Sequence, residues 1–122
     1  MDKIFEKNSM KCAAQYMLTQ LSEELHDNAV RHGFYDEHDN LMGFLAGLDA
    51  PDKCVPVQRD FVLAQLAKIS SEIGEAVDEV QHGKLDSEDF AEELADIMIR
   101  TLDLCGFLRI DAGKAIIEKA EK

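Results

Sequence analysis

The chain has 122 residues with a formal net charge of −12, and 46% of them are hydrophobic. A chain of this length and hydrophobicity can bury one core, so we expect a single domain over residues 1–122. The acidity argues against nucleic acid as a partner, because phosphate contacts need clusters of Lys and Arg, and no apolar run approaches the roughly 20 residues that would cross a membrane.

The first predicted element is a helix over residues 9–31, which Ser9 would cap and Gly33 would end. Many Ala, Leu, Glu and Lys residues, with only 2 Pro and 7 Gly, favour an all-α fold. Residues 33–56 contain three glycines and two prolines around a short apolar stretch, residues 41–48. We therefore expect a long connection here, with at most one short helix.

Three more helices are predicted beyond this connection. The second runs from near Pro56 to Gln81, with Gly83 closing it. The third covers residues 87–108, capped by Asp86 or Ser87, and the fourth follows Asp111 to the end of the chain. Because the link between the second and third helices is short, these two should form an antiparallel hairpin in a four-helix bundle.

Two acidic pairs with the same spacing lie on the hairpin. Glu72 and Glu75 occur in "SEIGEAVDEV", and Glu93 and Asp96 occur in "EELADIMI". Each residue advances about 100° around a helix, which places both pairs on the same flank of their apolar stripes. When two such helices face each other antiparallel, flanks of the same hand emerge on one side, so the four carboxylates should converge.

Converging carboxylates need cations, because the desolvation of a single carboxylate without a charged partner costs several kcal/mol. Four carboxylates without matching His or Cys are hard oxygen ligands, which suit Mg²⁺ and also Mn²⁺. The ordinary alternative is a solvated acidic face. In that case Lys68 and Arg100 would form i,i+4 ion pairs with Glu72 and Asp96.

The two pairs and their surroundings resemble the MazG-like all-α nucleoside triphosphate pyrophosphohydrolases. The resemblance lies in "SEIGEAVDEV" and "FAEELADIMIRTLDLCGFLRID", with a looser likeness around "HDNAVRHGFYDE". It covers most of residues 18–120. It implies a Mg²⁺-dependent enzyme that splits a (deoxy)nucleoside triphosphate into a nucleoside monophosphate and pyrophosphate, and that assembles as a homodimer or homotetramer.

The resemblance also implies roles for particular residues. Glu72, Glu75, Glu93 and Asp96 would be the catalytic metal ligands. Lys119, or less well Lys114, would contact the phosphates. The residues that would contact the base are His26, with Asn28 as a further candidate, and the aromatic residues Phe34 and Tyr35. The ordinary interpretation of Phe34 and Tyr35 is a hydrophobic cap that packs the long connection onto the core.

Two other kinds of protein stay open. Glu23 with His26 and Glu79 with His82 form ExxH strings, as in a di-metal carboxylate bundle, although such a bundle needs its acids spread over four helices. The other is a non-catalytic helical interaction module.

Cys12, Cys54 and Cys105 show no CxxC spacing, and the charged N-terminus lacks a signal-peptide apolar region. Together these features predict reduced thiols in a cytoplasmic protein.

Overall fold

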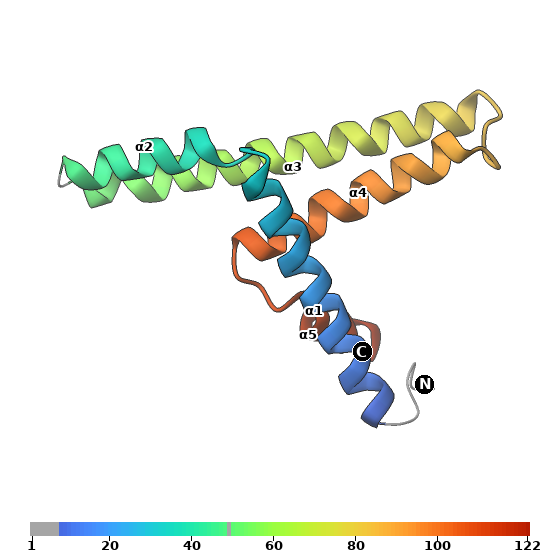
Figure 1. The fold of residues 1–122 in the computed structure, drawn as a ribbon. Helices are drawn as coiled ribbons and strands as arrows, with labels where there is room; N and C mark the ends of the chain where they lie inside the picture. Colours follow the sequence, from blue (N-terminus) through green and yellow to red (C-terminus); the bar gives the residue numbers. More distant parts are fainter. Residues whose placement is uncertain (1–7, 49) are drawn as a thin grey trace.

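The computed structural model describes residues 8–48 and 50–122, and over these residues the chain is helical without strands. The five helices, drawn in Figure 1, are α1 (Asn8–Arg31), α2 (Asp36–Gly47), α3 (Pro51–Gln81), α4 (Glu88–Phe107) and α5 (Ala112–Ala120). The all-α prediction is confirmed, with five helices where four were expected. None of the described helices is both long enough and apolar enough to cross a membrane.

The end of α1 follows from its glycine. Gly33 has a φ of +79°, and the N–H groups of Gly33 and Phe34 donate to the carbonyl oxygens of Val30 and Ala29. This left-handed residue just past a helix satisfies carbonyls that would otherwise lack partners. The predicted end of the helix is therefore confirmed, whereas Ser9, the predicted cap, lies inside α1.

The long connection predicted over residues 33–56, with room for one short helix, is mostly helical in the structure. Twelve of these residues form α2, and α3 begins at Pro51 rather than near Pro56. Acidic residues fill the first turn of α2, where they favour the positive end of the helix dipole. Pro56 is the sixth residue of α3, so it removes one main-chain hydrogen bond to the preceding turn, and the helix continues past it. Packing of α2 against α3 outweighs the cost of about 1 kcal/mol that each glycine imposes on a helix.

The predicted hairpin is confirmed, and it is formed by α3 and α4, which lie side by side and antiparallel (Figure 1). Gly83, with a φ of +75°, terminates α3. Ser87 caps α4, since its hydroxyl oxygen accepts a hydrogen bond of 3.1 Å from the N–H of Phe90. Local capping signals at both ends of the link thus fix where the two helices stop and start.

An aromatic cluster marks the core where α1, α2, α3 and α4 meet. Tyr35 is 3% exposed, and its ring stacks on Phe107 with centroids 4.9 Å apart. Phe61 of α3 contacts both rings and also His38 of α2, at centroid distances of 4.4–5.5 Å. This cluster holds the long α3 against the helices on either side of it.

The last helix packs against the first half of α1. The side chain of Asp111 caps α5 at the N–H of Lys114 and also accepts a hydrogen bond of 2.6 Å from Thr19. These hydrogen bonds lower the pKa of Asp111, with that from Thr19 the larger cause. Gly113 is buried so close to the main chain of Gln15 that a Cβ atom would overlap it. The predicted start of the last helix after Asp111 is therefore confirmed.

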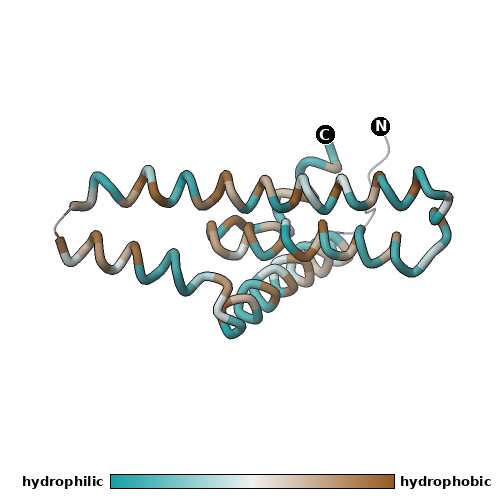
Figure 2. Tube along the Cα trace, turned by 90° about the horizontal axis from the view of Figure 1, so that it is seen from above, coloured by the Kyte–Doolittle hydropathy of each residue, from teal (hydrophilic) through white to brown (hydrophobic). Residues whose placement is uncertain are grey.

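One face of the α3–α4 hairpin remains uncovered by the described helices. Large apolar side chains there are 42–59% exposed, namely Ile73, Val77, Val80, Leu94 and Met98. Part of this face is a groove of about 450 Å³ between the two helices. Figure 2 shows hydrophobic positions recurring along both helices. We call this surface the hairpin face.

Candidate metal site

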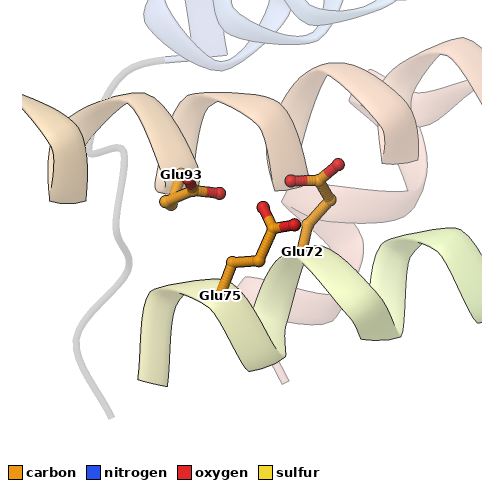
Figure 3. Close-up of side chains that lie close together, drawn as sticks. All are labelled: Glu72, Glu75 and Glu93. Carbon is orange, nitrogen blue, oxygen red and sulfur yellow. The ribbon is translucent and has the colours of Figure 1, made fainter. Parts of the chain in front are cut away.

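Three of the predicted acids meet on one side of the hairpin. Glu72 and Glu75 extend from α3 and Glu93 extends from α4, so that their side chains approach one another between the helices (Figure 3). Each offers a carboxylate oxygen, and these oxygens all lie within 4.8 Å of one another. Residues three apart share a helix face, which explains how one turn of α3 supplies two of the three groups.

The crowding changes the chemistry of Glu93. Burial, followed by the nearby carboxylates of Glu75 and then Glu72, raises the pKa of Glu93 to about 7. Its Oε2 atom is buried and has no hydrogen-bond partner among the described residues. A desolvated acid next to like charges favours its neutral form unless a cation compensates. The cluster therefore has both the ligand atoms and the unbalanced negative charge that a cation site requires.

Arg100 balances part of this charge. Its Nε donates a hydrogen bond of 3.0 Å to Oε1 of Glu72, which joins α4 to α3 across the hairpin. The i,i+4 pairs expected from the sequence, Lys68 with Glu72 and Arg100 with Asp96, are not among the ion pairs of the described residues. The guanidinium reaches the opposite helix instead, because the side chain of Glu72 is more enclosed, at 14% exposure, and a charge there gains more from a partner.

The fourth predicted ligand, Asp96, is not part of the three-acid group. It follows Glu93 by three residues on α4 and is exposed. The group that we call the acid cluster thus consists of Glu72, Glu75 and Glu93. Three carboxylates with no sulfur or nitrogen donor fit a hard divalent cation such as Mg²⁺ or Mn²⁺, which accepts a few carboxylates and keeps the rest of its coordination for water and phosphate.

The predicted phosphate-binding lysines lie elsewhere in this chain. Lys114 and Lys119 are both on α5, which packs mainly on α1 and has little contact with the α3–α4 hairpin (Figure 1). Within one chain the structure does not bring them to the acids. The basic residues near the acid cluster are instead Arg100 and, one turn before Glu72 on α3, Lys68.

The predicted base-contacting residues have three different environments. Nδ1–H of His26 donates to Oδ1 of Asp103, with 2.9 Å between the two atoms, and the rings of His26 and Tyr35 meet edge to face. Tyr35 is buried in the aromatic cluster, and burial, together with the Asp103 carboxylate, raises its pKa above the usual range. Phe34, by contrast, is 71% exposed. Of these three residues, only Phe34 presents an open ring to solvent.

The two ExxH strings do not assemble a metal site. Among the described residues, the group close enough to share an ion contains no histidine. His82 is exposed and contacts the main chain of Asp78 at 2.8 Å, while Glu79 faces Lys84, with 3.7 Å between their charged atoms. The di-metal carboxylate bundle therefore lacks the convergence of histidines and acids that it would need.

Two features of the site were missed from the sequence. The pairing of Arg100 with Glu72 depends on the register between α3 and α4, which spacing within one helix does not give. The burial of His38 depends on α2, a helix that was expected only as a short segment.

Searches against protein-family models, curated proteins and solved structures found no match to this chain.

Proposed function

We propose that this protein is a Mg²⁺-dependent pyrophosphohydrolase of the MazG-like kind, which splits a (deoxy)nucleoside triphosphate into a nucleoside monophosphate and pyrophosphate. The observation that carries the proposal is the acid cluster, three carboxylates from two helices with mutually close oxygens. The resemblance of residues 71–80 and 90–111 to that family supplies the reaction. A role in removing unwanted nucleotides from the cytoplasmic pool follows from that reaction.

The residues of the site would have different roles in binding the metal and the phosphates. Glu72, Glu75 and Glu93 would hold the metal, with Asp96 close by on α4 for a further ion or a bound water. When bound, Mg²⁺ offsets the charge of the phosphates and lowers the pKa of a water molecule that attacks phosphorus. Arg100 keeps Glu72 in place and puts a positive charge beside the phosphate path.

The direct test is a panel of the common ribo- and deoxynucleoside triphosphates, each incubated with the protein and Mg²⁺. We expect pyrophosphate and a nucleoside monophosphate from at least one of them, and no turnover in EDTA. Release of single orthophosphate from every nucleotide would contradict the proposal. Absence of any hydrolysis by a protein that still binds Mg²⁺ would favour the alternative of a non-catalytic helical module.

We further propose that the protein is a homodimer or a larger homo-oligomer assembled through the hairpin face. Exposed apolar groups recur along both helices there, and such a continuous patch on a small chain indicates an interface. A second copy offers the same surface, so two hairpins related by a two-fold axis would cover each other as a four-helix bundle.

A charge placed on this face should break the assembly. Val77→Glu removes a 49% exposed apolar side chain from the hairpin face, while Val55→Glu changes a 72% exposed valine near the start of α3 and serves as a control. Mass measurement by analytical ultracentrifugation should show an oligomer for the wild type and the control and a monomer for Val77→Glu. A monomeric wild type at concentrations of about 0.1 mM would exclude this interface, because stable dimers bind far more tightly than that.

A further inference from the structure

A groove lies between α2 and the first half of α3, beside the aromatic cluster. Its volume is about 570 Å³, within the range of small-molecule sites. Apolar and aromatic residues make up about half of its lining, and the others are polar or charged, including the carboxylates of Glu37 and Asp60. Its lining includes Phe34, His38, Phe61, Ala64, Gln65 and Lys68. We call it the α2–α3 groove.

The wall of this groove contains a buried polar group without a partner. The His38 side chain is 5% exposed, its Nδ1 lies 3.3 Å from Oδ1 of Asp39, and its Nε2 has no hydrogen-bond partner among the described residues. The ring packs against Phe61 with centroids 4.4 Å apart. A buried nitrogen without a partner is costly, and a phenyl ring at this position would avoid that cost.

The groove continues toward the acid cluster. A neighbouring hollow of about 260 Å³ is lined by Arg100 and shares Phe34, Gln65 and Lys68 with the groove. Arg100 in turn holds Glu72. At 1.5 Å per residue, Gln65 lies about 10 Å from Glu72 along α3, a distance that a sugar and a triphosphate chain can cover.

Lys68 lies on this route. It lines both the groove and the hollow, and it forms no ion pair with any residue in the described part of the chain. An unpaired ammonium between an aromatic groove and an acidic metal site is placed to contact a ligand that carries a planar ring at one end and phosphates at the other.

We propose that the α2–α3 groove binds the base and sugar of the nucleoside triphosphate, with the phosphates running past Lys68 to the acid cluster. His38, in the wall of the groove, is then a specificity-determining residue: a small rotation of its ring would expose the enclosed Nε2 to a hydrogen bond with the edge of the base. Phe34 and Phe61 supply aromatic surface for the ring of the base. This inference rests on the proposed function for the identity of the ligand.

Filling the groove tests the location. Ala64 and Ala67 are both exposed on α3, but only Ala64 lines the groove. Ala64→Leu should weaken binding of a nucleoside triphosphate about tenfold or more, the loss of one stacking contact, when measured by calorimetry with Ca²⁺ in place of Mg²⁺. Binding of inorganic triphosphate, which has no base, should not change, and Ala67→Leu should bind both ligands like the wild type.

Replacing the histidine tests its role. His38→Phe keeps a ring in the aromatic cluster and removes the unpaired nitrogen, so the variant should melt at the same temperature as the wild type or higher. The ratio of affinities between the preferred base and the others should nevertheless fall about tenfold or more, because a missing hydrogen bond in a site built for it is costly. A merely structural histidine would leave this ratio unchanged.

The possible results separate the two proposals. Nucleotide binding that Ala64→Leu and His38→Phe weaken, without pyrophosphate release, would support the groove and overturn the proposed reaction. Pyrophosphate release with unchanged nucleotide affinity and base preference in both variants would support the reaction and overturn the groove. A wild-type protein that binds no nucleotide with either metal would overturn both.

Discussion

Replacing Glu93 by Gln should remove the pH dependence of metal binding. The pKa of Glu93 is about 7 because the carboxyl is desolvated and lies near Glu75 and Glu72. A metal ion must displace the proton, so binding should release most of a proton near pH 6 and little near pH 8. The apparent affinity of the wild type for Mg²⁺ should accordingly fall about tenfold for each pH unit below 7.

The proton release can be measured by calorimetric titration with Mn²⁺ or Mg²⁺ in buffers of different ionisation enthalpy. Glu93→Gln should bind the metal more weakly at high pH and release almost no proton at any pH. Glu88→Gln, at the exposed start of α4, is the matched control and should behave like the wild type. Equal proton release at pH 6 and pH 8 by the wild type would refute the assignment of the raised pKa to this cluster.

The same carboxyl also affects the stability of the metal-free protein. Its pKa rises from 4.5 to about 7 on folding, so the protonated form favours the folded state. Its stabilising contribution is complete below about pH 4.5 and is lost as the pH rises through about 7. Glu93→Gln is neutral throughout, so in EDTA its melting temperature should exceed that of the wild type at pH 8, with the difference shrinking toward pH 5.

Four further substitutions test the packing and the charges. Arg100→Gln removes the partner of Glu72; it should lower the stability of the metal-free protein by about 1 kcal/mol or less, since the pair is partly exposed, and should tighten Mg²⁺ binding, as calorimetry would show. Tyr35→Ala should cost about 3–5 kcal/mol of unfolding free energy, whereas Phe34→Ala should cost little, because only the first ring is buried; equal losses in denaturant titrations would contradict this. Gly113→Ala should lower the melting temperature markedly, because its Cβ would overlap the main chain of α1, and an unchanged value would show that α5 does not pack as described.

Local signals in the sequence predicted most helix ends correctly. Gly33 and Gly83 end helices by adopting a positive φ, and Ser87 and Asp111 start helices by accepting hydrogen bonds from main-chain N–H groups. Each of these interactions lies within a few residues, so the sequence alone contains it. The glycines and prolines between residues 33 and 56 predicted a connection where the structure has the helix α2. This helix is stabilised by packing on α3, which no local sequence pattern reveals.

The acid cluster could be predicted from the rotation per residue in a helix and from the antiparallel pairing of the hairpin. Rotation of 100° per residue places Glu72, Glu75 and Glu93 on flanks that an antiparallel hairpin brings together, and the structure has them there. The axial register was not available from rotation alone. It decides that Arg100 pairs across the hairpin with Glu72, and that Asp96 falls outside the group.

In the proposed oligomer, the acid cluster and the hairpin face lie on the same two helices, so metal binding would be coupled to self-association. An ion held by Glu75 and Glu93 would bridge α3 to α4, and the same two helices present the apolar groups that a second copy would cover. A metal ion on one side of the hairpin and a second copy on the other would both favour the same distance between α3 and α4. By thermodynamic reciprocity, Mg²⁺ should lower the dissociation constant of the dimer by the same factor by which dimer formation tightens Mg²⁺ binding.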